Sequence, residues 1–478
     1  MTIVHMNKIH KIHFVGIKGV GMAPLAIIAK EAGFVVSGCD IADEFITDES
    51  LKKAEITPLV GFSKDHILNS DLVITTGAHG GFDNPEVIAA KEKGIPVWTQ
   101  GQAVGEFMKG DLFNRSQIGV SVTGSHGKTT TTAMLATTLK TSGKDPSYVI
   151  GTGNVSSLGS CGHFGKGKYF IAEADEYATE PTHDKTPKFL WQHPEIIIFT
   201  NIELDHPDLY QNVDAIRVAC LQFANQLPST GILIAYAGDP QTRMLLGEYK
   251  GKKITFGFTQ DCDFVITRIH QFEDRTFFWV SNHGNDMGEC MLFVPGEHNV
   301  LNATAALVAA LELGVSIEQI KKGLQAFVGS KRRFEYIGKL PSGALLYDDY
   351  AHHPTEIKKT LCAFKKRFPK HKMVCIFQPH TYSRTKTLFN EFISSFIDAD
   401  TVIMCNIYSS LREKPDEAIS SEMLVSGMRK YNPNVLFLPT LDDVVKYVES
   451  AHYNSHTVVI TMGAGDIYKI SKKLKVES

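Results

Sequence analysis

Residues 118–130, Ile-Gly-Val-Ser-Val-Thr-Gly-Ser-His-Gly-Lys-Thr-Thr, predict a buried strand, a glycine turn and the start of a helix. The glycines let backbone N–H groups converge on phosphate oxygens, and the helix N-terminus adds a favourable dipole. Lys128 is placed to reach terminal phosphates, and the Thr129 hydroxyl is placed to ligate Mg²⁺. The spacing, Gly-x-x-Gly-Lys-Thr, is two residues shorter than the general P-loop. Because a plain strand–turn–helix connection does not need this lysine, the stretch predicts phosphate binding.

Short apolar runs alternate with helix-length amphipathic stretches on both sides of this loop. Such alternation predicts an α/β fold with mainly parallel sheets. Residues 250–295 lack helical periodicity and predict short antiparallel strands. The clearest predicted strands are Ile12–Val15, Phe34–Ser37, Leu72–Thr75, Ile118–Val122, Phe170–Ala172, Ile196–Phe199, Val374–Phe377, Val402–Met404 and Val458–Thr461, and the clearest helices are Met22–Ala32, Thr129–Leu139 and Leu301–Leu313.

The chain is long enough, at 478 residues, for about three domains. Two strand–helix units begin with a glycine-rich turn, and the polar stretch 109–116 between them reads as a linker. A second break in composition falls at residues 329–333. We therefore predict domains at residues 1–109, 110–329 and 330–478.

Composition and charge exclude several classes of protein. Hydrophobic residues make up 43% and charged residues 21%, which excludes a disordered or fibrous chain. The net charge of -3 offers no global basic field, so we expect no nucleic-acid partner and no attraction to anionic membranes. Residues 1–8 lack the apolar core of a signal peptide, and no apolar run approaches the ~18 residues of a membrane-spanning helix. We expect a soluble, cytoplasmic protein without membrane insertion.

Eight cysteines are scattered along the chain, and none stands in a Cys-x-x-Cys pair. This pattern indicates reduced, structural thiols rather than a disulfide or zinc framework.

Acidic and polar clusters follow two of the predicted strands. Residues 172–177, Ala-Glu-Ala-Asp-Glu-Tyr, gather three carboxylates, and residues 200–206, Thr-Asn-Ile-Glu-Leu-Asp-His, follow the next strand. Clustered carboxylates repel one another unless a cation is present, so the cluster predicts that a metal ion binds there. Each cluster alone also fits a solvated loop. Together with the phosphate loop they predict a Mg²⁺–ATP site at the carboxyl edge of the sheet.

A second glycine loop, Gly16-Ile17-Lys18-Gly19-Val20-Gly21, follows the first predicted strand, and Asp40 follows the next. The arrangement is similar to a dinucleotide fingerprint, with Asp40 placed to bind a ribose hydroxyl. The glycine order is Gly-x-x-Gly-x-Gly rather than Gly-x-Gly-x-x-Gly. The loop therefore predicts either a nucleotide diphosphate site or a structural tight turn.

Three later motifs carry further polar groups. Asn299 and Asn302 stand three apart at a helix start, where they could read a base or ribose or could cap the helix. Residues 331–334, Lys-Arg-Arg-Phe, form a basic cluster of the kind that is usually solvated. Residues 347–355, Tyr-Asp-Asp-Tyr-Ala-His-His-Pro-Thr, gather acids and imidazoles at unusual density before a helix.

Read in order, these motifs resemble those of the Mur ligase family, the ATP-dependent amino-acid ligases of peptidoglycan synthesis. The resemblance spans nearly the whole chain. The family implies an N-terminal Rossmann-like domain for a UDP-sugar, a central P-loop ATPase with a small antiparallel portion, and a C-terminal Rossmann-like domain for the amino acid. The motifs that carry it lie at 123–130, 173–176, 201–206, 296–302, 331–335, 348–356, 377–380, 382–385 and 463–467.

The resemblance also implies roles for individual residues. Gly16, Gly19, Gly21 and Asp40 would bind the UDP-sugar, so the first loop need not bind NAD. ATP would be bound by Gly124, Ser125, His126, Gly127, Lys128, Thr129, Thr130, Asn299, Asn302 and Arg333. Mg²⁺ would be ligated by Thr129, Glu173 and His206, and the amino acid would face His353 and Arg384. The residues expected to act in catalysis are Lys128, Glu173, His206, Arg333, Asp349 and His353.

Within the family, the resemblance is greatest to members that join L-alanine to UDP-N-acetylmuramate through an acyl phosphate. Two features are instead similar to the ligase that adds a murein tripeptide: the long stretch 177–189, and Thr381 in place of a usual arginine. An NAD-dependent dehydrogenase and a non-catalytic nucleotide switch are alternatives from other classes. The expected oligomeric state is a monomer or a homodimer.

Overall fold

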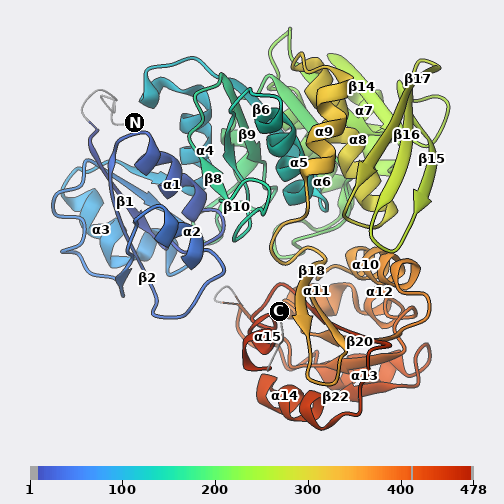
Figure 1. Cartoon of the computed structure of the whole chain (residues 1–478). Coiled ribbons are helices and arrows are strands. Elements are labelled where there is room, and N and C mark those ends of the chain that lie inside the picture. Colours follow the sequence, from blue (N-terminus) through green and yellow to red (C-terminus); the bar gives the residue numbers. More distant parts are fainter. Residues whose placement is uncertain (1–8, 411–412, 475–478) are drawn as a thin grey trace.

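The computed structural model describes residues 9–410 and 413–474. Within these residues the strands form three large sheets and one small hairpin, which follow one another along the chain as an N-terminal, a central and a C-terminal unit (Figure 1). Most neighbouring strands are parallel, so the predicted α/β fold is confirmed. Residues 1–8, where the sequence lacks the core of a signal peptide, lie outside the described residues.

The N-terminal sheet has the strand order β3-β2-β1-β4-β5, and all its neighbouring strands are parallel. The order reverses between β1 and β4, and ligands of such sheets bind beside the carboxyl ends of the strands at this point. Its strands are β1 (Lys11–Val15), β2 (Val35–Asp40), β3 (Leu59–Val60), β4 (Leu72–Thr75) and β5 (Val97–Thr99). Its helices are α1 (Ala23–Glu31), α2 (Asp48–Lys53), η2 (Gly81–Asp83), α3 (Pro85–Glu92), α4 (Gln100–Lys109) and η3 (Asp111–Phe113).

The central sheet has the order β17-β16-β15-β14-β13-β12-β6-β9-β7-β8, so β6, which precedes the phosphate loop, lies well inside it. Its strands are β6 (Ile118–Thr123), β7 (Ser147–Val149), β8 (Gly162–His163), β9 (Tyr169–Glu173), β12 (Ile196–Phe199), β13 (Ile232–Tyr236), β14 (Lys252–Gly257), β15 (Phe264–Gln271), β16 (Thr276–Asn282) and β17 (Asn285–Leu292). Its helices are α5 (Lys128–Thr141), η4 (Lys188–Trp191), α6 (Val213–Ala224), α7 (Pro240–Glu248), α8 (Glu297–Glu312) and α9 (Ile317–Ala326).

The prediction for residues 250–295 is right for β15, β16 and β17, which pair antiparallel. It is wrong for β14, which pairs parallel with both β13 and β15. The helix α7 between β13 and β14 accounts for the first of these pairings, because a helical crossover returns the chain in the same direction.

Helix α5 is unusual in its composition, since Thr129–Thr132 follow one another and Thr137 and Thr138 come later. β-Branched residues lower intrinsic helix propensity. The helix is nevertheless buried from Thr129 to Leu139, and it packs against α8 and α9. Tertiary burial rather than local propensity therefore stabilises the helix that follows the phosphate loop.

The C-terminal sheet has the order β18-β19-β23-β20-β21-β22, and β18 is its antiparallel edge. Apolar clusters cover both faces of the sheet. Its strands are β18 (Glu335–Lys339), β19 (Leu345–Asp349), β20 (Lys372–Phe377), β21 (Thr401–Met404), β22 (Val435–Phe437) and β23 (Thr457–Met462). Its helices are α10 (Pro354–Arg367), α11 (Tyr382–Thr387), α12 (Phe389–Ile393), α13 (Ser421–Met428), α14 (Leu441–Ser450) and α15 (Lys469–Lys473).

The N-terminal and central units share one apolar cluster. Phe170 and Ala172 of the central sheet pack in the same cluster as Ile27 and Phe107 of the first unit. Leu112 joins this cluster, so the predicted linker 109–116 is packed rather than free. The hairpin of β10 (Ala178–Glu180) and β11 (Asp184–Pro187) also reaches the first unit, where the His183 ring lies 2.9 Å from the Asp83 carboxylate.

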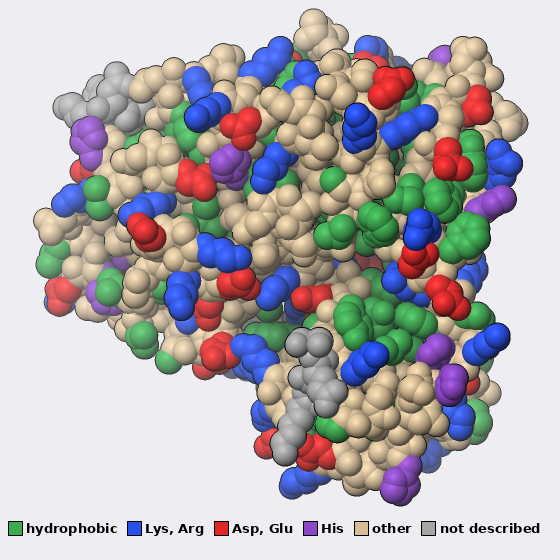
Figure 2. Space-filling model, viewed as in Figure 1, with side chains coloured by type: hydrophobic (Ala, Val, Ile, Leu, Met, Phe, Trp, Pro, Cys, Tyr) green, Lys and Arg blue, Asp and Glu red, His purple; other side chains and the backbone are tan. Residues whose placement is uncertain are grey.

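Charged side chains of both signs are scattered over the visible face of the molecule, with no large patch of one sign (Figure 2). Within the described ranges 9–410 and 413–474, no helix combines the length and the apolar character needed to cross a bilayer.

Candidate active site

The phosphate loop lies where the sequence predicts it, between β6 and α5, and the segment after β12 holds it in place. His126 donates its backbone N–H to Asn201 Oδ1 at 3.0 Å, and Asn201 Nδ2 donates to the His126 carbonyl at the same distance. The Ser125 hydroxyl donates to the Glu203 carbonyl at 3.0 Å. The two polar segments that follow neighbouring strands therefore form one edge of the site.

Gly127 precedes α5 with a φ of +85°, a conformation that favours glycine. A Cβ atom there would lie 2.4 Å from Asn302 Oδ1. Asn302 donates to Asn299 Oδ1 at 3.3 Å, and both residues lie in the first turns of α8. The loop and the two predicted nucleotide-binding asparagines are thus in direct proximity.

Lys128 forms an ion pair with Glu176, its Nζ lying 2.9 Å from Oε2, and it also donates to the Gly124 carbonyl at 2.6 Å. Burial disfavours the charged lysine, but the charges of Glu176 and Asp175 outweigh burial and raise the pKa of Lys128. Asp175 has its own partner in Lys188, at 2.8 Å. Lysines therefore balance two carboxylates for which the sequence suggested a metal ion.

Thr129 and Glu173 form a separate pair, in which the hydroxyl donates to Oε2 at 3.1 Å. Burial raises the pKa of Glu173, although the Gly151 N–H and Lys128 offset part of this effect. A hydroxyl and a partly buried carboxylate beside a phosphate loop are hard oxygen donors of the kind that Mg²⁺ prefers. The predicted Thr129–Glu173 part of the metal site thus has donors that suit the ion.

His206, the third predicted metal ligand, lies in a different group. Its Nε2 is 3.8 Å from both Glu176 Oε1 and Asp205 Oδ2. One donor atom from each of Asp175, Glu176 and His206 fits within a span of 4.8 Å. The structure thus places His206 beside Lys128's carboxylate partner rather than in the Thr129–Glu173 pair.

A pocket opens beside the phosphate loop, between the central and C-terminal units. Its apolar wall includes Phe256, Phe327 and Phe334. Aromatic and apolar walls with a few polar groups are typical of small-molecule sites. The predicted residues that line it are His126, Gly127, Thr130, Asn299, Asn302, Arg333 and Asp349.

Two of these lining residues come from the C-terminal side of the junction. Asp349 ends β19 and accepts backbone hydrogen bonds from Phe334 at 2.7 Å and Ala351 at 2.9 Å. Burial raises the pKa of Asp349 to about 6, while Arg333 and these N–H groups act in the opposite direction. Arg333 lies 3.5 Å from Glu356 Oε1. Both units therefore contribute charged groups to the same pocket.

His126 of the phosphate loop faces two carboxylates, with Glu203 at 3.5 Å and Glu356 at 3.4 Å. Burial favours the neutral imidazole, but the two carboxylates outweigh burial and raise the pKa of His126 to about 9. Glu356 belongs to α10, where it accepts the backbone N–H of His353 in a capping box. A charge contact therefore joins the loop to the C-terminal unit.

The predicted amino-acid-binding residues lie across the same junction. His353 Nε2 donates to the Leu204 carbonyl at 3.2 Å. Burial lowers the pKa of His353 to about 4, and the positive charge of nearby His126 acts in the same direction. Arg384 is buried and donates to Asp205 Oδ1 from Nε at 3.0 Å and from Nη2 at 2.6 Å. Both side chains thus contact the 200–206 segment of the central unit.

The predicted UDP-sugar residues lie apart from this pocket, in the first unit. Gly16, with a φ of +75°, donates its N–H to the Cys39 carbonyl at 2.9 Å. Gly19 and Gly21 complete the turn into α1. Asp40 is buried, accepts the backbone N–H groups of Lys18 and Ile41 at 2.8 Å each, and lies 3.3 Å from His79 Nε2. Asp40 thus stabilises the glycine loop through the Lys18 N–H, and its contact with a ribose stays a prediction.

Sequence reasoning did not single out several residues that the structure places in the site. The quoted motifs contained Glu203, Asp205 and Glu356, but nothing in the sequence told which distant partner each would meet. Asp205 and Arg384, for example, are 179 positions apart. No sequence feature marks Lys188 as a residue of the site, apart from its place in the long stretch 177–189.

Three family models match consecutive parts of the chain. The Mur ligase family, catalytic domain, matches residues 11–111, and the Mur ligase middle domain matches residues 122–310. The Mur ligase, glutamate ligase domain, matches residues 332–465. Together these three matches cover most of the chain, and they follow one another without overlap.

Individual proteins are similar over nearly the full length. UDP-N-acetylmuramate–L-alanine ligase of Desulfitobacterium hafniense is 38% identical over 97% of this chain and 99% of its own. The structure of UDP-N-acetylmuramate–alanine ligase from Thermotoga maritima is 28% identical with a TM-score of 0.78, covering 97% of each chain. A murein peptide ligase from Psychrobacter arcticus is 26% identical with a TM-score of 0.70, covering 97% of this chain and 98% of its own. The three-domain α/β fold, the ordered motifs and these similarities together show that the chain belongs to the Mur ligase family.

Proposed function

We propose that this protein is an ATP-dependent ligase that joins L-alanine to the lactyl carboxylate of UDP-N-acetylmuramate, a step of peptidoglycan precursor synthesis. The observation that carries the proposal is the phosphate loop with Lys128, which lies at a pocket lined from both the central and C-terminal units. The full-length similarity to alanine-adding ligases supports the choice of substrates. In this assignment residues 1–109 bind the sugar nucleotide, 110–329 bind ATP and 330–478 bind the amino acid.

ATP would lie with its phosphates at residues 124–130 and its nucleoside in the pocket beside Asn299 and Asn302. The aromatic wall of this pocket suits a base, and Arg333 and Asp349 offer polar contacts from the C-terminal unit. Lys128 would move its charge from Glu176 toward the terminal phosphates, a short shift for a flexible ammonium. Its raised pKa keeps it charged throughout the neutral range.

Thr129 and Glu173 are the residues that would hold Mg²⁺, and His206 would approach from the neighbouring group. Bound there, the ion would supply charge neutralisation to the triphosphate. In the chain itself, the Thr129 hydroxyl at the start of α5 lies 3.1 Å from the Glu173 carboxylate at the end of β9.

The chemical problem is that a carboxylate resists attack by an amine until one oxygen becomes a leaving group. Transfer of the ATP γ-phosphoryl group to the lactyl carboxylate forms an acyl phosphate and releases ADP. The alanine amine then attacks the acyl carbon, and phosphate leaves from the tetrahedral intermediate. Lys128 would stabilise the charge on the transferring phosphoryl group.

Water has to be excluded, since it would hydrolyse the acyl phosphate. The contacts of His353 with the Leu204 carbonyl and of Arg384 with Asp205 hold the C-terminal unit against the central unit. The same two residues would face the incoming amino acid, His353 as a neutral imidazole because its pKa is lowered. We infer that closure of this junction and binding of the acceptor use one set of residues.

The murein-tripeptide alternative is not favoured by the comparisons, in which the similar curated proteins are alanine-adding ligases. The stretch that suggested it forms the β10–β11 hairpin, and the hairpin contacts the N-terminal unit through His183 and Asp83. Membership of a ligase family likewise gives no support to the dehydrogenase alternative.

Mass spectrometry of products tests the proposal. Purified protein receives UDP-N-acetylmuramate, MgATP and an equimolar mixture of alanine, glycine, serine and murein tripeptide. We expect UDP-N-acetylmuramoyl-alanine as the main product, with one ADP and one phosphate formed per amide. A main product carrying the tripeptide would overturn the acceptor assignment, and ATP consumption without any amide would overturn the ligase activity.

A further inference from the structure

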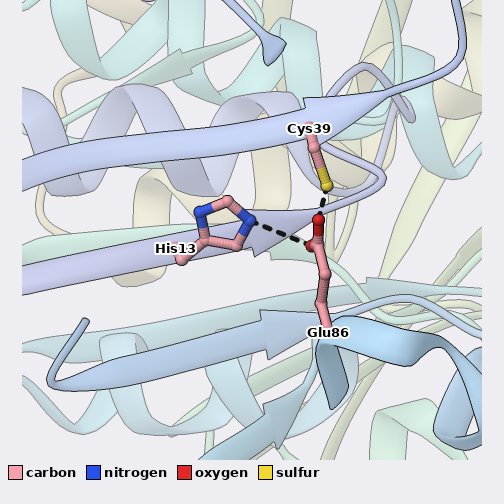
Figure 3. A group of neighbouring side chains, drawn as sticks. All are labelled: His13, Cys39 and Glu86. Atoms are coloured by element: carbon pink, nitrogen blue, oxygen red, sulfur yellow. Dashed lines mark hydrogen bonds and ion pairs between the residues drawn. The ribbon is translucent and has the colours of Figure 1, made fainter. Parts of the chain in front are cut away.

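A buried group of metal-ligating side chains lies in the N-terminal unit, away from the pocket described above. His13 of β1, Cys39 of β2 and Glu86 of α3 point toward one another between the strands and the helix (Figure 3). His13 Nε2 lies 3.1 Å and Cys39 Sγ 2.9 Å from the same oxygen, Glu86 Oε2. One donor atom of each residue falls within a span of 4.8 Å, and all three side chains are fully buried.

The outer contacts of these residues hold them in place. The second ring nitrogen of His13, Nδ1, lies 2.9 Å from the Ser37 hydroxyl, which can accept as well as donate. The other oxygen of Glu86 accepts from the Ser63 N–H at 2.9 Å and from His66 Nδ1 at 2.7 Å. Metal-binding histidines and carboxylates in proteins have such partners on their remaining atoms.

We propose that His13, Cys39 and Glu86 form a binding site for a divalent transition-metal ion, of which zinc best matches the donor set. A thiolate, an imidazole and a carboxylate are the three ligand types of protein zinc sites. The Cys39 thiol proton leaves to solvent on binding, and His13 binds through Nε2 while Nδ1 donates to Ser37. His66 holds the other oxygen of Glu86, and its partly exposed ring marks the path by which an ion would enter.

A nucleophilic role for Cys39 is disfavoured by its surroundings. Burial and the hydrogen bond to Glu86 raise the pKa of the thiol, and reactive cysteines need the opposite. The sequence offered no sign of this site, because its ligands come from separate elements and no Cys-x-x-Cys pair is present.

The site lies directly under the first glycine loop. The Cys39 carbonyl accepts the backbone N–H groups of Gly16 at 2.9 Å and Ile17 at 3.1 Å, and the next residue is Asp40. An ion here would tie β1, β2 and α3 together beneath the loop predicted to bind the sugar nucleotide. We assign it a structural role rather than a catalytic one.

Cobalt substitution tests the proposal on the full-length protein. After treatment with a chelator, the protein is titrated with Co²⁺ and its absorption is recorded for a thiolate-to-cobalt charge-transfer band. We expect this band to saturate at about one equivalent of metal. The predicted Mg²⁺ site contains no cysteine among its described residues, so cobalt bound there would not give this signal. Absence of the band in the wild-type protein overturns the proposal.

Variants identify the ligands. Cys39→Ser keeps a hydroxyl donor to Glu86, so the fold is retained while the charge-transfer band should disappear. Cys375→Ser is the matched control, because Cys375 is equally buried in the C-terminal sheet and should leave the band unchanged. A band of wild-type strength in Cys39→Ser overturns the proposal.

A second measurement does not depend on the thiol. His13→Gln keeps an N–H group near Glu86 but offers a poorer metal donor, so Zn²⁺ affinity measured by competition with a chromophoric chelator should fall at least about tenfold. Equal affinity in wild-type and variant protein would remove His13 from the site. Circular dichroism on each variant verifies that the proteins compared are folded.

Discussion

The two glycine loops of this molecule look alike in sequence but differ in how their charged residues are used. Each follows a parallel strand and leads into a helix. In the first loop Lys18 stands before the helix, and its Nζ donates to the Ile41 and Asp43 carbonyls at 3.3 and 2.7 Å. In the second loop Lys128 is the first residue of the helix and pairs with Glu176.

The difference teaches that the position of the lysine, rather than the glycine spacing, distinguishes the two loops, and it is the basis for proposing chemistry at the second loop only. The first loop satisfies its polar groups internally, through Asp40 and neighbouring carbonyls. The second loop directs its cation toward Glu176 and its Thr129 hydroxyl toward Glu173, where we propose that a nucleotide and a metal ion bind.

The largest expected effect comes from exchanging the lysines for alanine. Lys128→Ala should lower turnover by about 10²–10³-fold, because it removes a charge that stabilises the transferring phosphoryl group. Lys18→Ala should lower turnover by less than about tenfold, because Lys18 only supports its loop. Phosphate release under saturating substrates measures both. Equal losses in the two variants would erase the proposed distinction between the loops.

A medium effect concerns the charge contact that only the second loop makes with the C-terminal unit. The folded-state pKa of His126, about 9, lies above the ordinary value near 6.5. Its contribution to stability is therefore complete below about pH 6.5 and is lost as pH rises through about 9. The contribution is at most about 3 kcal/mol.

Thermal unfolding of wild-type protein and His126→Gln between pH 6 and 10 measures this contribution. The wild-type protein should be the more stable at pH 6, and the difference should shrink toward pH 10. The titratable groups that face His126 are Glu203, Glu356 and His353, and their lowered pKa values keep each of them in one protonation state across this pH range. A difference that does not change with pH would contradict a charged His126.

The smallest effect is expected in the first loop. Asp40→Asn replaces one accepting oxygen by an amide N–H that faces a backbone N–H, which costs about 1–2 kcal/mol. The KM for UDP-N-acetylmuramate should rise several-fold, while the KM for ATP stays the same. Steady-state kinetics with each substrate varied in turn measures the two KM values separately. A parallel rise in the KM for UDP-N-acetylmuramate and the KM for ATP would contradict the assignment of the loop.

Local features of this fold could be predicted from sequence, because strand and helix patterns depend on neighbouring residues. The strand before the phosphate loop and the helix after it are confirmed as β6 and α5. The helix α8 begins at Glu297, so its apolar pattern from Leu301 is preceded by a polar first turn that holds Asn299, in agreement with the predicted helix start. Helix ends of this kind are set by tertiary contacts.

The composition of the candidate site was less predictable. The sequence points to a metal ion for the carboxylates at 173–176, whereas Lys128 and Lys188 balance two of them in the structure. The family resemblance implies that Arg384 faces the amino acid, and the sequence does not show that it pairs with Asp205 of another unit. These partners meet only when separate sheets pack together, and no local pattern carries that information.

The threonine-rich helix α5 has a consequence for the order of events on the ribosome. Residues 123–130 are made early, but this helix has little propensity of its own and packs against α8 and α9, which end at Ala326. A growing chain can therefore complete the packing of this helix only after about two-thirds of its 478 residues have been synthesised. Until then the loop that we propose binds ATP precedes a helix without its packing partners.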